Sequence, residues 1–466
     1  MHLHLNPAPY AAVDPPVRDG AYRTVSFWHE TVPITPGPPL DHDVDCDVAI
    51  IGGGYTGLST AYHLKQYAPD LSVVLLERAV IGHGASGRNG GFAMPLLGWD
   101  LLYTAEKLGE AAAGRAYRLM YDAVEHVKRM VREHQLDCDL ETTGYIMINT
   151  CKRREARARR EHTVAERLGF DHQWLDHNAL QEHIRGEQFL SGIYDPHPCI
   201  LNPAKLAREM KRLIESLGVQ VYEQTPLTEL VVARSASARL TLRTPQAKVQ
   251  ARQVVLAVNG YGASLGFMKD RILPVHTYIV LTEPLSQQQL EGIGWAKYRT
   301  SLETARNMIH YFRLTADRRI AFGGEDADLY PGGAYKDVDE KICAALKARF
   351  REYFPSLRDV RFTHQWGGVL GVSLDMFPSF GRGGPDNNVF HATGYSGHGV
   401  SLSNYAGALL APEMLHALGV PNPPPRLELP FFYGKQPSWL PPGPLRYYGM
   451  RAYRLALRAQ DRLEGA

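Results

Sequence analysis

Glycines near residue 50 carry the clearest chemical signal in the sequence. The run from Ile50 to Gly57 has the pattern G-x-G-x-x-G directly after a short apolar segment. Gly52 allows a tight turn, Gly54 lets the backbone approach a pyrophosphate, and Gly57 lets the next helix pack against the strand. The N-terminus of that helix presents free N–H groups and a partial positive charge to phosphates. The spacing therefore predicts a dinucleotide site.

A carboxylate stands where such a site needs one. Glu77 ends the next apolar segment, 20 residues beyond Gly57, where it can accept hydrogen bonds from a ribose diol. Its charge would repel the 2′-phosphate of NADP, but the motif does not separate FAD from NAD. A glycine-rich turn without a ligand is the alternative interpretation.

Two further glycine clusters point to a larger ligand. Five glycines lie between residues 82 and 91, and Arg88 among them could neutralise a phosphate. Residues 388–400 predict a strand, a glycine turn and the start of a helix, whose N–H groups suit the negative charge of a reduced flavin. A nicotinamide has no such need, so this cluster favours a flavin. A flexible loop and an ordinary turn of the sheet are the respective alternatives.

A parallel sheet is needed to position these turns. Apolar strands at 48–51 and 73–76, with a helix over 57–67 between them, form a βαβ unit. The later strands suggest a mixed or antiparallel second sheet. Further helices are expected over 103–135, 152–168, 203–217 and 400–418, and further strands over 219–221, 238–243, 248–258, 275–283, 308–314 and 319–323.

The composition limits the class of protein. The chain has 466 residues, 44% of them hydrophobic, and a formal net charge of +2, which gives no field that demands nucleic acid as a partner. Five scattered cysteines without a CxxC spacing support neither a disulfide framework nor a zinc site, so we expect no metal and a cytoplasmic setting. The first residues lack the features of a secretory signal, and no run of apolar residues is long enough to predict a membrane span.

Together these segments resemble the FAD-dependent amine and amino-acid oxidoreductases of the D-amino-acid-oxidase superfamily. The resemblance covers about residues 45–420, and GASGRNGG and GYSGHGVSLS are most similar to the γ-glutamylputrescine oxidase branch. The other matching segments are IIGGGYTGLSTAYHL, LLERAVIGHGASGRNGGF, LNPAKLAREMKRLIESLGVQVYEQTPL, RQVVLAVNGYG and NNVFHATGYSGHGVSLS.

The resemblance implies an α/β plus α+β fold. A discontinuous Rossmann-like FAD-binding domain pairs with a substrate domain built on an antiparallel sheet, and the flavin ring lies between them. The expected bounds are an N-terminal arm at 1–44, the FAD-binding domain at 45–100, 195–270 and 365–420, the substrate domain with a helical insert at 101–194 and 271–364, and a C-terminal tail at 421–466.

The resemblance also implies the cofactor contacts. It places the pyrophosphate at Gly52, Gly54 and Gly57, the ribose at Glu77, and the adenine against the backbone of Leu227. The other residues it implies around FAD are Tyr55, Thr56, Arg78, Ser86, Arg88, Asn89, Gly90, Gly91, Asn259, Gly260, Gly394, Tyr395, Ser396, Gly397, His398 and Gly399.

Three departures separate the sequence from related sarcosine oxidases. Those enzymes attach flavin through a cysteine near the position of Trp366, and no cysteine follows Cys343 here, so we expect non-covalent FAD. Ser401 and the pair Gly91-Phe92 stand where those enzymes hold a small carboxylate with basic residues, which disfavours a sarcosine-like substrate. The lysine associated with dioxygen activation would fall near Ala321, which leaves oxidase versus dehydrogenase open.

The expected reaction is hydride transfer from an amine-bearing carbon to flavin N5, giving an imine that water hydrolyses to a carbonyl. The protein would orient a neutral amine and lower its pKa by desolvation. The candidate catalytic residues are Tyr311, Arg313, Trp366, His398 and Glu325.

Each candidate has a chemical and a structural interpretation. On a strand, Tyr311 and Arg313 point to one face, where Tyr311 would bound the pocket and Arg313 would meet a distant carboxylate. Trp366 would pack on the flavin, His398 would hydrogen-bond flavin or substrate, and Glu325 would pair with a substrate ammonium. The structural alternatives are a packed tyrosine beside a surface arginine for Tyr311 and Arg313, and core packing for Trp366. For His398 the alternative is a satisfied structural histidine, and for Glu325 it is a solvated loop charge.

Four functions compete. The leading interpretation is an FAD-dependent oxidase that acts on a γ-glutamylated or free polyamine, or a similar amine, and whose flavin is reoxidised by dioxygen. An amino-acid dehydrogenase passing electrons to a carrier or quinone, and a non-catalytic flavin-bearing binding protein, are alternatives, and the 394–399 cluster disfavours an NAD-dependent dehydrogenase. Arginines spaced over 446–462 could place the tail on a membrane surface, although we expect it to pack on its own domain.

Overall fold

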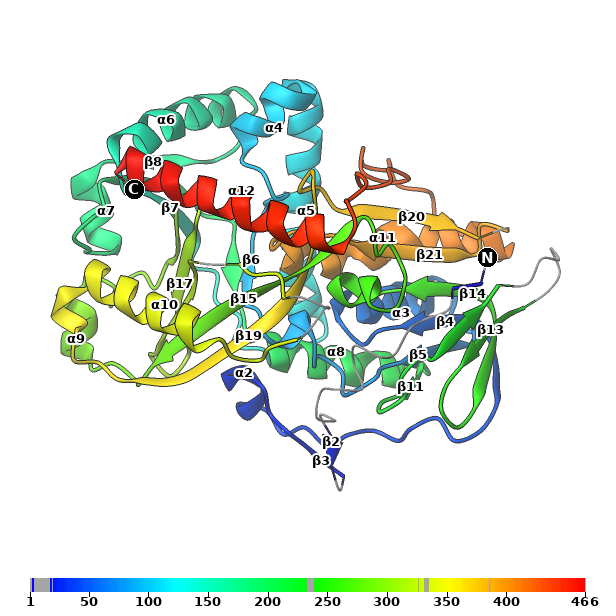
Figure 1. Cartoon of the computed structure of the whole chain (residues 1–466). Coiled ribbons are helices and arrows are strands. Elements are labelled where there is room, and N and C mark those ends of the chain that lie inside the picture. Colours follow the sequence, from blue (N-terminus) through cyan, green and yellow to red (C-terminus); the bar gives the residue numbers. More distant parts are fainter. Residues whose placement is uncertain are drawn as a thin grey trace.

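Two β-sheets organise the chain, and they lie side by side in the computed structural model (Figure 1). The structure describes residues 2–3, 17–18, 20–232, 239–325, 327–330, 335–384 and 386–465. The first sheet draws strands from the start, middle and end of the sequence, whereas the second is built from strands between residues 145 and 373. The mixed α/β fold with a largely antiparallel second sheet, expected from the sequence, is confirmed.

The first sheet has a parallel centre, since β21, β14, β4, β5 and β11 run in the same direction. Their central segments, residues 48–51, 73–76 and 254–256, are apolar and buried because both faces of the sheet are covered there. In sheet order the described strands are β1 (His2–Leu3), β12 (Glu229–Val231), β13 (Leu240–Arg243), β14 (Lys248–Leu256), β4 (Val44–Ile51), β5 (Val73–Leu76) and β11 (Gln220–Tyr222), with β21 (Val389–Thr393) beside β14 and β20 (Ser379–Gly383) beside β21.

Four helices cover one face of this sheet: α3 (Tyr55–Tyr67), α5 (Glu110–Glu133), α8 (Pro203–Ser216) and α11 (Gly399–Leu418). The start of α8 follows the sequence, because the Asn202 side chain accepts from the Lys205 N–H and a proline fills the first helical position. The single helix expected over 103–135 is two, α4 (Leu101–Leu108) and α5, because Gly109 between them has a φ of 83°.

The second sheet is antiparallel except where β16 runs parallel to β7. Alternate side chains such as Leu302, Phe312 and Phe322 form a core on the side of α10 (Glu340–Tyr353), and the opposite face is turned toward the first sheet. In sheet order its strands are β19 (Phe362–Ser373), β15 (Ile272–Thr282), β18 (Ile320–Gly324), β17 (His310–Leu314), β16 (Ser301–Thr304), β7 (Tyr145–Asn149), β9 (Ser191–Asp195) and β8 (Gln173–Leu175).

The structure differs from the expected domain bounds at two places. β19 pairs with β15 along its length, so residues 365–373 belong to the second sheet. The apolar face of α5 packs into the core of the first sheet, although this helix was expected in the substrate domain. Residue 238, at the start of the expected 238–243 strand, lies outside the described residues, and β13 and β14 form the expected hairpin.

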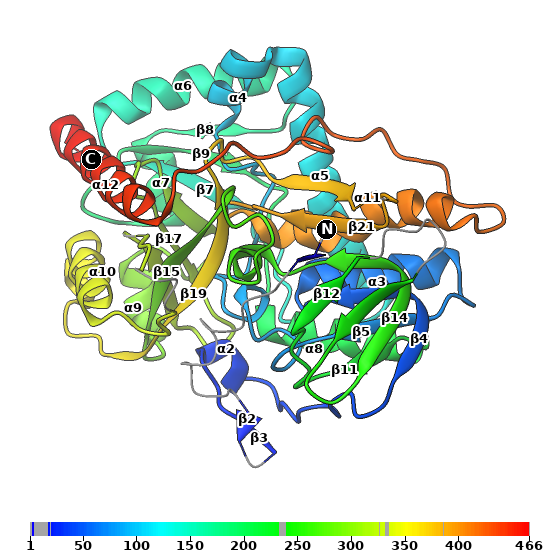
Figure 2. The ribbon, with the colours of Figure 1, turned by 45° about the vertical axis from the view of Figure 1, so that its right-hand side comes forward.

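The two ends of the chain dock on this framework. The described part of the N-terminal arm contains α2 (Phe27–Glu30), which buries Trp28 against Trp366. α12 (Gly443–Glu464) lies along the second sheet near α6 (Lys152–Arg167), as both views show (Figure 1, Figure 2). Arg454 of this helix pairs with Asp328 at 3.0 Å, whereas Arg451 and Arg462 are exposed. The remaining elements are β2 (Val17–Arg18), β3 (Ala21–Tyr22), β6 (Phe92–Ala93), β10 (Cys199–Ile200), α7 (His177–His183), α9 (Gln287–Gly292), and the short 3-10 helices η1 (Ala85–Gly87), η2 (Asn259–Ala263) and η4 (Pro355–Leu357).

Candidate active site

Three turns meet at one edge of the first sheet. The parallel strands β4, β14 and β21 end at Ile51, Leu256 and Thr393. Because the carboxyl ends of parallel strands share an edge, the turns that follow these strands lie together. Open α/β sheets bind their ligands at this edge.

Close packing explains the glycines of the first turn. A Cβ atom on Gly57 would overlap the Gly52 carbonyl oxygen, and Gly52 itself has a φ of 108°. The N-cap residue of α3, Gly54, has no side chain to cap the helix, and the Tyr55 N–H donates instead to Ser86 Oγ at 3.0 Å. A Cβ atom on Gly54 would approach that oxygen to 2.8 Å. Gly54 therefore keeps this helix N-terminus and the Ser86 hydroxyl accessible to a phosphate.

Glu77 holds the first turn in shape. One carboxylate oxygen accepts from the Gly53 N–H at 2.7 Å and the other from the Ala79 N–H at 2.8 Å. Burial raises the pKa of Glu77. Each oxygen retains a lone pair for a ribose hydroxyl.

The segment that follows β11 lies beside Glu77, at the end of β5. The Thr225 N–H donates to the Glu77 carbonyl at 2.8 Å, and Leu227, two residues further along, is buried in the core on that face of the sheet. Arg78 follows Glu77 and is partly buried. Glu77, Arg78 and Leu227 thus share one end of the site.

The loop at 82–91 is tied to the second sheet through Arg88. Its guanidinium donates to the Asp337 carboxylate at 2.6 Å and to the His83 carbonyl at 2.7 Å. The Trp366 indole donates to the Arg88 carbonyl at 2.8 Å. Arg88 is therefore engaged in an ion pair of its own, and the phosphate contact expected from the sequence would compete with that pair. Asn89 shapes the turn by accepting from the Gly91 N–H at 2.7 Å.

The turn after β21 is fixed from two sides. The Gly394 N–H donates to Asn259 Oδ1 at 3.1 Å, and the Tyr395 hydroxyl lies 2.7 Å from Thr56 Oγ1 at the start of α3. The Ser396 N–H donates to the carbonyl of Gly371 on β19 at 3.0 Å. A Cβ atom on Gly260 would come within 2.8 Å of the Leu370 backbone. This turn therefore lies where the two sheets meet.

His398 presents an unsatisfied nitrogen in this turn. Its Nδ1 atom is buried and has no hydrogen-bond partner among the described residues. Burial lowers the pKa of the imidazole to about 4, so the ring is neutral near pH 7. α11 begins at Gly399 without a side-chain cap, and Gly397 has a φ of 96°. An orphaned nitrogen beside an uncapped helix N-terminus fits the polar edge of a flavin.

Tyr311 and Trp366 project from the face of the second sheet that is turned toward the first. The Tyr311 ring lies edge-to-face with Phe92 at 5.7 Å between centroids, and a Cβ atom on Gly90 would be 3.1 Å from it. Trp366 packs in the same cluster as Ile279. The structure thus brings both expected aromatic residues against the 82–92 loop.

Arg313 and Glu325 have partners of their own. Arg313 is 1% exposed, and its guanidinium donates to the carbonyls of Leu201 at 2.6 Å and Leu314 at 3.0 Å. Glu325 lies 2.6 Å from Nε2 of His310, a ring that stacks on Phe322 in the core beside α10. The structure does not bring Glu325 to the face that carries Tyr311.

Sequence reasoning missed Glu303. It lies directly opposite Tyr311 on β16, is 8% exposed, and has its pKa raised to about 8 by burial. Tyr145, on the adjoining strand β7, has a buried hydroxyl without a partner among the described residues. The available signal was a charged residue between Leu302 and Thr304 in a segment too short to be recognised as a strand.

Several other features bear on the cofactor. All five cysteines are buried and unpaired. The described residues contain no group of three or more His, Cys, Asp and Glu side chains that could hold a metal ion. No helix in the described ranges is long and apolar enough to cross a membrane.

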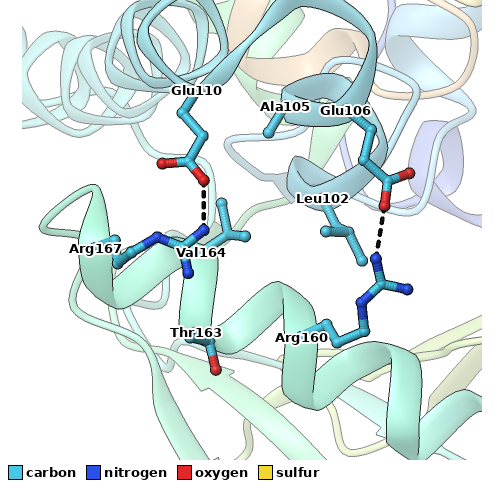
Figure 3. Close-up of a pocket in the computed structure, with 8 residues that line it drawn as sticks. All are labelled: Leu102, Ala105, Glu106, Glu110, Arg160, Thr163, Val164 and Arg167. Atoms are coloured by element: carbon cyan, nitrogen blue, oxygen red, sulfur yellow. Dashed lines mark hydrogen bonds and ion pairs between the residues drawn. The ribbon is translucent and has the colours of Figure 1, made fainter.

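A surface cleft of about 370 Å³ lies elsewhere, between α4, the start of α5, and α6 (Figure 3). Ion pairs of Arg160 with Glu106, at 2.9 Å, and of Arg167 with Glu110 cross it. The cleft contains none of the candidate site residues, and its charged groups are already paired.

The fold and these turns define a flavoprotein oxidoreductase. Residues 47–412 match the DAO family of FAD dependent oxidoreductases, and the chain belongs to that family. The enzyme therefore carries out FAD-dependent oxidation of amines or amino acids.

Individual relatives narrow the comparison. The chain is 30% identical over 383 residues to gamma-glutamylputrescine oxidoreductase of Escherichia coli K12, covering 81% of this chain and 85% of the relative. It is 28% identical to a probable oxidoreductase, OrdL, of Haemophilus influenzae, with 81% and 85% covered. Glycine oxidase from Geobacillus kaustophilus shares the fold, with a TM-score of 0.68 and 20% identity over 80% of this chain and 95% of that chain.

Proposed function

We propose that this enzyme oxidises a C–N bond of a γ-glutamylated or free polyamine, or a similar amine, and that dioxygen reoxidises its flavin. The E. coli relative, at 30% identity, is named for γ-glutamylputrescine, which supports this substrate class. The bound FAD would supply the hydride acceptor.

The charge around Tyr311 carries this proposal. Arg313 lies on the same face of β17, and its guanidinium is engaged with backbone carbonyls. The carboxylate of Glu303, opposite Tyr311, has no hydrogen-bond or ion-pair partner among the described residues. Ser401 donates to the Met94 carbonyl at 3.0 Å and brings no positive charge. This arrangement favours an amine over a small amino acid held by its carboxylate.

The residues would divide the work as follows. Tyr311 bounds the substrate, Trp366 packs near the ring, and His398 offers its neutral imidazole to flavin or substrate. Arg313 acts as a positioning residue, because its donors hold the backbone at Leu201. Glu325 is a positioning residue as well, through His310.

FAD binding is proposed to be non-covalent and the setting cytoplasmic. Cys343 is buried in the core beside α10, and no cysteine follows it in the sequence. The glycine turns, Glu77, Asn259 and the 394–399 turn would hold the cofactor through backbone and side-chain hydrogen bonds. Acid precipitation of the purified protein should release all of its flavin into the supernatant.

A dehydrogenase that passes electrons to a carrier or quinone is the second candidate. Ala321 lies near the position of the lysine that is associated with dioxygen activation in related sarcosine oxidases, and it is buried with Ile279 and Leu281. An apolar position without a cation favours slow reaction with dioxygen, and hence this alternative.

An anaerobic titration followed by absorbance tests both candidates. Adding 1,4-diaminobutane, its γ-glutamyl derivative and individual amino acids should bleach the flavin with the amines. Rapid recolouring on admission of air supports the oxidase, and slow recolouring with fast reduction of a quinone supports the dehydrogenase. Bleaching by amino acids alone, or by nothing, would refute the proposed substrate class, and the latter outcome would favour a non-catalytic role.

A further inference from the structure

Glu303 faces the cofactor side of the second sheet from a position beside Tyr311. The two residues are directly paired across the antiparallel strands β16 and β17, so their side chains leave the same face. Their neighbours Leu302 and Phe312 leave the opposite face and enter the core beside α10. Glu303 is therefore directed toward the side on which Tyr311 meets the 82–92 loop.

No described residue satisfies this carboxylate. Other buried acids in the chain have donors: Glu223 accepts from Arg208 at 2.8 Å, and Asp461 accepts from two backbone N–H groups. Glu303 is 8% exposed, and no hydrogen bond or ion pair to its oxygens joins it to another described residue. A buried carboxylate without a partner is costly unless a cation or a hydrogen-bond donor arrives to meet it.

A second unsatisfied group lies beside it. Ser301 and Glu303 pair with Tyr145 and Met147 on β7, so Tyr145 leaves the same face. The Tyr145 hydroxyl is buried and lacks a partner in the part of the chain that the structure describes. Burial raises the pKa of both phenols, Tyr145 and Tyr311, and the negative charge of Glu303 raises each further. The strand pairing places all three residues on one face. An acceptor flanked by two phenols is suited to an alkylammonium ion.

We propose that Glu303, with the Tyr145 hydroxyl, binds the distal ammonium group of a diamine or polyamine substrate. This inference rests on the proposed function and names the specificity-determining residue of that site. The distal group is the appropriate one because a carboxylate favours the charged form of an amine, whereas the reacting amine must be neutral. Binding the distal group would leave the reacting end free to lie against the flavin.

The same charge explains discrimination against amino acids. Once Glu303 is ionised, a substrate carboxylate beside it would meet a like charge, and the guanidinium of Arg313 is occupied by the Leu201 and Leu314 carbonyls. Binding should also depend on pH, because burial raises the pKa of Glu303 to about 8 in the ligand-free enzyme. The titratable groups that face it are the phenols of Tyr311 and Tyr145, which remain neutral in this range because burial raises their pKa values.

The test compares Glu303→Gln with the wild-type holoenzyme on two matched amines, 1,4-diaminobutane and 1-aminobutane. Replacing a charged hydrogen bond by a neutral one should raise KM and the dissociation constant for the diamine about tenfold or more. The values for the monoamine should stay within about twofold, since it has no distal ammonium. The dissociation constant is read anaerobically from the perturbation of the oxidised flavin spectrum, so it is obtained even where no reduction follows.

The controls separate the possible failures. Glu291→Gln, on the exposed surface of α9, should leave both amines unchanged, and Glu303→Asp should retain part of the diamine preference. In the wild type the preference for the diamine, taken as the ratio of the monoamine to the diamine dissociation constant, should grow as pH rises from about 7 to 9. Glu303→Gln should lose that growth, because deprotonation of the reacting amine affects both amines alike. An unchanged diamine affinity in Glu303→Gln, with flavin reduction intact, would overturn this inference and leave the proposed function standing. Flavin that no amine reduces would overturn the proposed function instead.

Discussion

The Asn259 side chain joins two strand ends that lie 135 residues apart in sequence: its Oδ1 accepts a hydrogen bond from the Gly394 N–H at 3.1 Å. Asn259 follows β14 with a φ of 40°, and Gly394 follows β21 with a φ of 75°. Gly371 of the second sheet packs against the same amide, since a Cβ atom there would overlap Asn259 Oδ1. This side chain is thus one of the contacts that fix the turn that carries His398.

Asn259→Gly should weaken FAD binding. The glycine keeps the left-handed backbone conformation but removes the acceptor, so the Gly394 N–H loses its partner. We expect about a tenfold rise in the dissociation constant for FAD, measured by fluorescence after adding FAD back to the apoprotein. The control is Asn178→Ala, at an exposed position of α7. Alanine is used there because a glycine would itself destabilise the helix. Equal FAD affinity of the variant and wild type would contradict this role.

Gly54 and Gly57 should separate cofactor binding from folding. A Cβ atom on Gly54 meets only the Ser86 hydroxyl, a side chain that can rotate, and it would occupy the approach to the N-terminus of α3. A Cβ atom on Gly57 meets the backbone of Gly52. Gly54→Ala should therefore fold but bind FAD at least about tenfold more weakly, whereas Gly57→Ala should also lower the Tm of the apoprotein.

The matched control for this pair is Gly292→Ala, where a Cβ atom has open space around it. Thermal unfolding of the three apoproteins and FAD titration of each give the comparison. If Gly54→Ala bound FAD with wild-type affinity, the prediction that the pyrophosphate binds at this turn would be wrong.

The sequence predicted the first sheet better than the second. β4, β5 and α3 are local in sequence, and their glycine turn and apolar runs are explicit in residues 48–76. The second sheet is built from pairs such as β16 with β7, whose partners lie more than a hundred residues apart, and β16 has only four residues. A short strand of the sequence SLET has no periodicity to recognise.

The residues of the candidate active site show the same contrast between local sequence signals and contacts between distant segments. Gly52, Glu77 and the 394–399 turn are recognisable because each follows a strand at a characteristic spacing. The partners of Arg88, Arg313 and Glu325 come from distant segments, so the sequence could not indicate that their charges are already engaged. Glu303 was missed because its relation to Tyr311 exists only through strand pairing.

Buried histidines should make the enzyme sensitive to acid. Burial lowers the pKa of six imidazoles to about 3 or 4, which are those of His29, His63, His126, His276, His391 and His398. The unfolded chain takes up these protons near pH 6.5, whereas the folded chain resists them until about pH 4. Stability from these groups is therefore fully present above about pH 6.5 and is lost as the pH falls through the window down to about 4.

Urea unfolding at fixed excess FAD, followed by tryptophan fluorescence, measures this loss. The midpoint should fall steeply between about pH 6.5 and 4.5, and His276→Gln should flatten the slope because it removes one buried imidazole. His42→Gln, at an exposed position, is the control. A midpoint that is constant over this window would show that the imidazoles are protonated in the folded state.

Asp461→Ala should release α12 without disturbing the cofactor. The Asp461 carboxylate is 1% exposed and accepts from the Asn307 N–H at 3.0 Å, the Met308 N–H at 2.9 Å and the Arg154 guanidinium at 3.0 Å. Asp461 is the one residue among the described part of the helix that is buried as a whole. The other anchors of α12 include the ion pairs of Glu464 with Arg154 at 2.7 Å and of Arg454 with Asp328 at 3.0 Å. Removing Asp461 takes away the only anchor that also holds backbone N–H groups among these three. The freed backbone N–H groups at 307 and 308 can be solvated once the helix leaves, which favours undocking over local collapse.

We therefore expect limited proteolysis to cleave Asp461→Ala within 435–465 at least about ten times faster than the wild type, with the ratio of FAD to protein unchanged. Arg462→Ala, which alters an exposed neighbour, should retain the wild-type cleavage rate. Loss of FAD together with faster cleavage would instead mean that α12 supports the flavin site through the β16–β17 turn, because Asn307 and Met308 connect Glu303 to Tyr311 along the chain.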